Sequence, residues 1–90
     1  MSWEEYEKKL RKNPAVQEAI EESALEYEIA RAIIEVRIRK GLTQKELAEK
    51  LHTRQSVISR VENARTTPSL AFLKRLADVL GCSLRVQLKT

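Results

Sequence analysis

The sequence predicts an all-α fold: a bundle of short helices, with a helical extension before it and a single β-strand after it. Three observations lead to this prediction. Apolar residues recur at helical spacing along most of the chain, and capping residues and glycines divide that pattern into segments. From Ser83 onward the apolar period changes to two. We therefore divide the chain into residues 1–22, the extension; residues 23–81, the bundle; and residues 82–90, the strand.

The N-terminal segment should begin with a short amphipathic helix. Ser2 can cap this helix, and Glu5 three residues later completes a capping box. Trp3, Tyr6 and Leu10 share one helical face. A helix this short is marginal alone, so its apolar face must pack on something. Either it packs on its own domain, or these three residues are a docking surface for a partner protein.

A second helix can begin at Asn13-Pro14, because proline fits a first helical position and the residue before it avoids helical backbone. We favour a break in the helical pattern near Ser23, although one unbroken helix as far as Lys40 is the alternative. The pattern is strongly helical from Ala24 to Lys40, and Gly41 should end that helix.

The long helix carries two adjacent apolar stripes. The first comprises Leu25, Ile29, Ile33 and Val36. The second comprises Ala30, Ile34 and Ile38. Two stripes are more than one small core needs, so we expect Ile34 and Ile38 to contact the N-terminal segment or a partner.

Two short helices joined by a tight turn should follow between Thr43 and Asn63. Thr43 and Glu46 form a capping box for the first, and Thr53 can cap the second. The apolar stripes comprise Leu47, Ala48 and Leu51 in the first helix and Val57, Ile58 and Val61 in the second. The opposite face of the second helix carries Arg54, Gln55, Ser56, Ser59 and Arg60.

That polar face suits the edges of base pairs in double-stranded DNA. Arginine can donate two hydrogen bonds to guanine, and glutamine can pair with adenine in the same bidentate way. The alternative for this helix alone is an ordinary solvated face.

The last predicted helix begins at Pro68-Ser69 and ends at Gly81. In the strand predicted after it, Leu84, Val86 and Leu88 alternate with polar residues. A single strand leaves its backbone groups unpaired. We therefore expect strand pairing in a symmetric homodimer, with addition to a partner's sheet and a frayed tail as alternatives.

Three segments in order resemble the phage-repressor (Xre-type) helix-turn-helix family. They are Leu42-Thr43-Gln44-Lys45-Glu46-Leu47-Ala48, Gln55-Ser56-Val57-Ile58-Ser59-Arg60-Val61-Glu62-Asn63, and Pro68-Ser69-Leu70. The resemblance covers roughly residues 27–81 and implies a lambda-repressor-like bundle. It also implies a DNA-binding repressor whose two reader helices enter successive major grooves of a palindromic operator.

The resemblance also assigns roles to individual residues. It implies that Arg37 pairs with Glu62 and orients the DNA-binding face, and that Gln44, Asn63 and Arg65 contact phosphates. The family usually has glycine where this chain has His52 and Ala64.

A second resemblance concerns the order of the segments. An acidic helical segment ahead of such a domain resembles HigA-type antitoxins. That likeness implies a small basic RelE/HigB-like ribonuclease toxin as partner and autoregulation of the pair's operon; a stand-alone regulator is the alternative.

The charge distribution agrees with a DNA-binding role. Residues 1–28 hold eight Glu against four Lys and Arg, a net charge of −4, and residues 29–90 hold thirteen Lys and Arg against five acidic residues, a net of +8. Phosphate neutralisation requires such a basic part, whereas the acidic part should face a basic protein. With one His, one Cys and no glycine-rich phosphate loop, we expect no enzyme, cofactor or metal. No signal peptide or membrane span is evident, so we expect a cytoplasmic protein.

Overall fold

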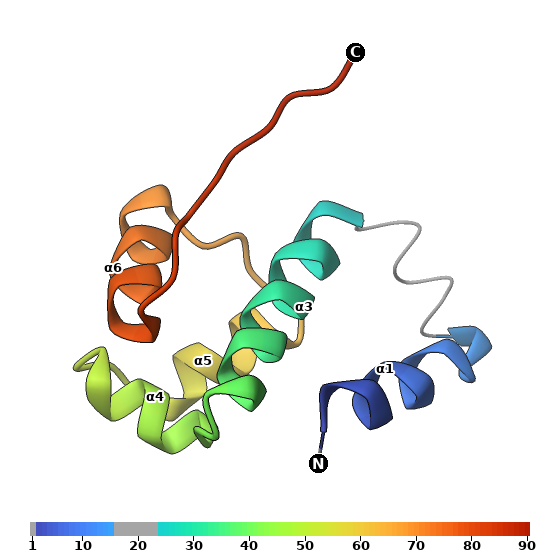
Figure 1. The fold of residues 1–90 in the computed structure, drawn as a ribbon, viewed down its shortest axis with the longest axis horizontal. Helices are drawn as coiled ribbons and strands as arrows, with labels where there is room; N and C mark the ends of the chain where they lie inside the picture. The colour runs from blue at the N-terminus through green and yellow to red at the C-terminus, as the bar shows by residue number, and fades with distance from the viewer. Residues whose placement is uncertain (1, 16–23) are drawn as a thin grey trace.

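The computed structural model describes residues 2–15 and 24–90, and this part of the chain contains five labelled helices (Figure 1). They are α1 (Trp3–Arg11), α3 (Ala24–Arg39), α4 (Gln44–Lys50), α5 (Gln55–Glu62) and α6 (Leu70–Leu80). Pro14 and Ala15 also have helical backbone, and Asn13 caps them by accepting the Ala15 N–H at 3.0 Å. The rest of the predicted second helix and its break near Ser23 lie outside the described residues.

Helices α3 to α6 share one hydrophobic core. Its most deeply buried side chains are Leu47, Leu51 and Ile58, from the end of α4 and the middle of α5. The core is completed by Ile33, Ala48, Val61, Leu76 and Leu80. These are the positions that the helical spacing assigns to the inner face of each helix, so the all-α bundle is confirmed in this region.

Short side chains fix where most of the helices begin. The capping box at α4 is confirmed: Thr43 Oγ1 accepts the Glu46 N–H at 3.0 Å, and Glu46 Oε1 accepts the Thr43 N–H at 3.0 Å. Ser2 and Ser69 also cap their helices, accepting backbone N–H groups at 3.2 and 3.1 Å. Each cap satisfies a donor that the first turn of a helix leaves without a partner.

The prediction that Thr53 caps α5 is wrong. The N-cap residue is Arg54, and it makes no side-chain capping bond. Thr53 instead belongs to the turn that closes α4, where its N–H donates to the Ala48 carbonyl at 2.9 Å. Since that bond holds Thr53 in the turn, α5 starts one residue later.

Helix α1 packs against α3 (Figure 1). Trp3 is only 8% exposed, stacks on Tyr6 with ring centroids 5.7 Å apart, and receives the Arg31 guanidinium over its ring at 5.8 Å. Arg31 also pairs with Glu7, and Arg39 lies 3.6 Å from Glu4. Two glutamates of α1 are therefore paired with arginines of α3, in addition to the packing of Trp3.

The predicted C-terminal strand is wrong, and with it the strand as a dimerisation element. Residues 82–90 leave α6 as an extended coil, and the described residues contain no strand anywhere (Figure 1). Leu84, Val86 and Leu88 do alternate with polar residues, but the last two are 78% and 95% exposed. Alternation alone does not make a strand, because a strand also needs a neighbour for its backbone hydrogen bonds. The described part of this chain supplies no such neighbour.

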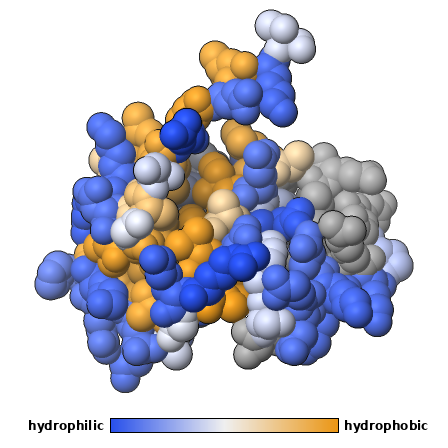
Figure 2. All heavy atoms as spheres, viewed as in Figure 1, coloured by the Kyte–Doolittle hydropathy of each residue, from blue (hydrophilic) through white to orange (hydrophobic). Residues whose placement is uncertain are grey.

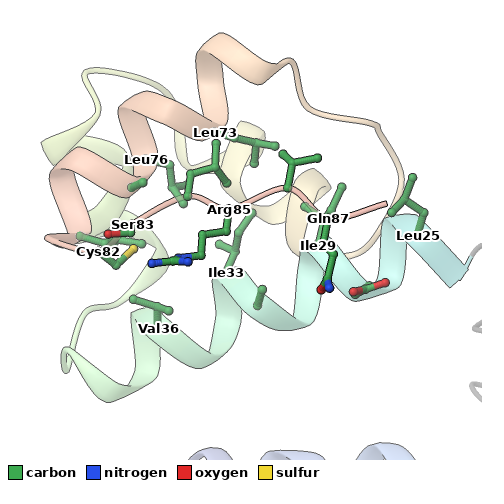
Figure 3. A pocket seen from close by; sticks show the side chains of 16 residues that line it. Leu25, Ile29, Ile33, Val36, Leu73, Leu76, Cys82, Ser83, Arg85 and Gln87 are labelled. Atoms are coloured by element: carbon green, nitrogen blue, oxygen red, sulfur yellow. The ribbon is translucent and has the colours of Figure 1, made fainter. Parts of the chain in front are cut away.

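The tail passes over an apolar groove of about 380 Å³ between α3 and α6 (Figure 3). Ile29, Ile33 and Val36 line the α3 side, and Leu73 and Leu76 line the α6 side. Hydrophobic residues gather on this face beneath the tail (Figure 2). Among the described helices, none is long and apolar enough to span a membrane.

Candidate nucleic-acid interface

The turn between α4 and α5 sets the position of the candidate reader helix. Leu51 closes α4, and His52 follows with a left-handed backbone, φ 55°. Glycine is usual at this position in the family that the sequence resembles, and histidine tolerates the left-handed region better than most residues. The chain reverses here, so that α5 packs across α4 on their shared apolar face.

Helix α5 has a buried side and an exposed polar side. Ile58 and Val61 are buried in the core, whereas Arg54, Gln55, Ser56 and Arg60 are exposed and Ser59 is half-buried. The side chains of the four exposed residues bond to no other described residue. The structure therefore presents two guanidinium groups, an amide and a hydroxyl on one short helix.

The backbone turns again where α5 ends. Asn63 is the C-cap residue, and Ala64 has a left-handed backbone with φ 57°. Asn63 Nδ2 donates to Ser59 Oγ at 3.3 Å. Asn63 and Arg65 are exposed directly after the polar side of α5, as phosphate-contacting groups need to be.

A buried ion pair ties the end of α5 to α3. Arg37 Nε donates to Glu62 Oε2 at 2.6 Å, and Arg37 Nη2 donates to Glu62 Oε1 at 2.9 Å. Arg37 Nη1 also donates to the Leu42 carbonyl at 2.9 Å, just ahead of α4. The side chains of Arg37 and Glu62 are 14% and 3% exposed. This two-point pair, which the sequence suggested through a family resemblance, fixes three elements relative to one another.

Gln44 joins the same network. Its Nε2 donates to Glu62 Oε1 at 2.9 Å, which links the first residue of α4 to the last residue of α5. The capping bonds at Thr43 hold the pKa of Glu46 below its ordinary value, because hydrogen bonds from the Thr43 backbone and side chain stabilise the carboxylate. The start of α4 is therefore fixed by the Thr43–Glu46 capping bonds and by the bond from Gln44 to Glu62.

Helix α1 reaches the neighbourhood of this ion pair, which sequence reasoning did not anticipate. Burial raises the pKa of Tyr6, and the negative charge of Glu62 raises it further, while Arg37 and Arg31 act in the opposite direction. No pattern in the sequence could place Tyr6 near Glu62, because the distance between them depends on how α1 packs against α3.

The residues proposed as a docking surface lie largely inside the molecule. Trp3 and Ile34 are buried, and Tyr6 and Ile38 are half-buried. Leu10 lies on α1, but its side chain falls outside the described part. Of the two alternatives for this helix, packing on its own domain and docking to a partner, the structure shows the first for Trp3. The structure does not gather these residues on an open surface.

The geometry defines a helix-turn-helix unit with an exposed polar second helix, the architecture that places a recognition helix in the major groove of DNA. Residues 33–87 match the helix-turn-helix family model. The chain is also 31% identical over 85 residues to an uncharacterized HTH-type transcriptional regulator of Haemophilus influenzae, covering 94% of this chain and 83% of the relative. The chain belongs to the helix-turn-helix family of DNA-binding transcription regulators.

Other relatives share a shorter stretch. The chain is 41% identical over 61 residues to a putative multi-protein-binding factor 1 of Yarrowia lipolytica, which is 68% of this chain and 40% of the relative. It is 42% identical over 57 residues to a competence pilus inhibition repressor of Acinetobacter baylyi, which is 63% of this chain and 52% of the relative. The chain spans about half the length, or less, of these curated relatives. No solved structure matches the chain.

Proposed function

We propose that this chain is a sequence-specific repressor that binds a palindromic operator in double-stranded DNA as a homodimer. One observation carries the proposal: the polar side of α5 is exposed, while its other side packs in the core and Glu62 at its end is paired with Arg37 of α3. A rigid helix that presents arginine and glutamine side chains to solvent is suited to reading base edges.

In this proposal the residues divide into two groups. The base-reading group comprises Arg54, Gln55, Ser56, Ser59 and Arg60. The phosphate-holding group comprises Gln44, Asn63 and Arg65. Because Gln44 uses its Nε2 on Glu62, its contribution to a phosphate comes from the backbone N–H groups at the start of α4 as well as from its remaining side-chain atoms. Two copies would set their α5 helices about 34 Å apart, one turn of DNA.

A binding selection from random duplexes tests the proposal. The wild-type chain should enrich a palindromic site, and Gln55→Ala should relax the base preference at one position in each half-site, at a cost of about 1–3 kcal/mol. Gln87→Ala, which removes the same group from the exposed tail, is the matched control and should enrich the wild-type site. Identical preferences for wild type and Gln55→Ala would remove Gln55 from the reader.

A second candidate function is neutralisation of a protein partner, a small basic toxin. It is supported by the net charge of −4 over residues 1–28, where Glu4 and Glu5 are exposed at the start of α1, and by a relative whose name describes multi-protein binding. The antitoxin role itself rests on the resemblance of the segment layout alone. Since Trp3 is buried on α3, such a partner would contact the exposed carboxylates of Glu4 and Glu5 rather than the aromatic stripe of α1.

A native pull-down followed by mass spectrometry separates the two candidates. A stoichiometric small basic protein, lost when residues 1–22 are deleted while operator binding persists, would support neutralisation. Recovery of the chain alone would leave a stand-alone regulator, and equal capture of the basic protein by the truncated chain would exclude residues 1–22 as its docking segment.

A further inference from the structure

One polar side chain of helix α6 donates a hydrogen bond to the turn of the helix-turn-helix unit. Arg75 Nη2 donates to the Leu51 carbonyl at 2.6 Å, across 24 residues of sequence. Figure 1 shows α6 beside the α4–α5 turn. The Leu51 carbonyl belongs to the last turn of α4, whose carbonyls lack partners within the helix. A guanidinium is well matched to that end of the helix dipole, and a charged donor makes a short, strong hydrogen bond.

The turn that receives this bond is held by the buried Leu51 side chain and by backbone bonds to α4, and it includes a backbone conformation that is costly for its residue type. His52 holds a left-handed backbone that residues other than glycine rarely adopt, and Arg54, the N-cap residue of α5, makes no side-chain capping bond. His52 and Thr53 donate their backbone N–H groups back to Glu49 and Ala48 of α4, and the Arg54 carbonyl accepts the Val57 N–H in the first turn of α5. Arg75 therefore supplies a tertiary contact at the point where the chain changes direction toward the reader helix.

We infer that Arg75 is a positioning residue for DNA recognition: by holding the Leu51 carbonyl, it sets the angle at which Arg54 and Gln55 meet the bases. The inference rests on the proposed DNA-reading role of α5. Arg75 acts through the turn and does not itself touch DNA. Its loss should therefore weaken binding to the matched site while leaving the sequence-independent attraction to phosphates unchanged.

The test compares Arg75→Met, which keeps an unbranched apolar stem but removes the donors, with Arg75→Lys, which keeps a charged donor. Lys74→Met, on the adjacent exposed lysine of α6, is the matched control for loss of one positive charge. Affinities for the selected operator and for a scrambled duplex are measured at several salt concentrations. Arg75→Met should lower operator affinity at least fivefold, scrambled-duplex affinity less than twofold, and leave the salt dependence unchanged. Arg75→Lys should recover most of the loss, and Lys74→Met should bind like the wild type.

Other outcomes overturn the inference in distinguishable ways. Equal losses for operator and scrambled duplex, with a salt slope reduced by about one, would make Arg75 a phosphate contact. Equal losses with an unchanged slope and a lower folded fraction by circular dichroism would give it only a stabilising role. Unchanged operator affinity would remove any role. If the wild-type chain itself prefers no sequence, the proposed function fails, and that result is visible before any variant is compared.

Discussion

Removing the charge of Glu62 should destabilise the packing that positions the reader helix. The variant is Glu62→Gln, which keeps the size and shape of the side chain. Glu62 accepts hydrogen bonds from Arg37 Nε at 2.6 Å, from Arg37 Nη2 at 2.9 Å, and from Gln44 Nε2 at 2.9 Å. The glutamine leaves a guanidinium that is only 14% exposed without its counter-charge.

The size of the effect follows from the burial of both partners. Hydrogen bonds to a charged group contribute about 1.5–3 kcal/mol each, and breaking a buried pair from one side costs about 3–5 kcal/mol in total. Arg37 keeps its bond to the Leu42 carbonyl, so we place the loss near the lower end, about 3 kcal/mol. A domain of this size has only about 5–13 kcal/mol of stability, so this is a large part of the whole.

Urea unfolding followed by helical circular dichroism measures this loss. With a slope of about 1.5 kcal/mol per molar urea, the midpoint for Glu62→Gln should fall by about 2 M with the slope unchanged. The double variant Arg37→Met with Glu62→Leu removes both charges and should recover most of the stability, because an apolar pair of similar volume needs no counter-charge. A loss below 1 kcal/mol, or a double variant as unstable as the sum of the single variants, would refute the reasoning.

Two further predictions concern the backbone at Ala64 and the titration of Glu46. Ala64→Gly should raise the melting temperature by about 3–6 °C, because the left-handed backbone costs alanine about 1–2 kcal/mol and the freedom of glycine in the unfolded chain returns only part of that gain. Ala71→Gly on the exposed face of α6 is the control and should lower the melting temperature, and equal shifts for the two variants would exclude the backbone explanation. The lowered pKa of Glu46 stabilises the fold at pH values above its ordinary pKa, and this stabilisation is lost as pH falls below about 4.5. The wild type should therefore lose stability relative to Glu46→Gln as melting curves are taken from pH 7 to pH 3, and a constant difference between the two would argue against it.

Much of the helical architecture was predictable because its determinants are local. Thr43 and Ser69 cap helices through bonds to residues three positions ahead, and the core residues follow helical spacing. The position of Arg37 and Glu62 came from a family resemblance, since no local rule joins residues 25 positions apart.

The features that were predicted wrongly or not at all depend on contacts that local residue preferences do not reveal. The cap of α5 shifted by one residue because Thr53 is held by a bond to Ala48, which the capping preference of threonine does not reveal. Alternation after Ser83 suggested a strand, but strand formation depends on a neighbour that the described residues do not contain. The contact between Arg75 and the Leu51 carbonyl depends on how α6 packs beside the turn, and it leaves no periodic signal.

The most direct test of the central claim, that the polar side of α5 reads DNA, is a titration of the ¹⁵N-labelled chain with the selected operator, followed by amide chemical shifts. We expect the largest shifts at residues 54–60, at Gln44 where α4 begins, and at Asn63 and Arg65 after α5. Shifts concentrated instead on α1, or on the groove between α3 and α6, with α5 unmoved, would contradict it.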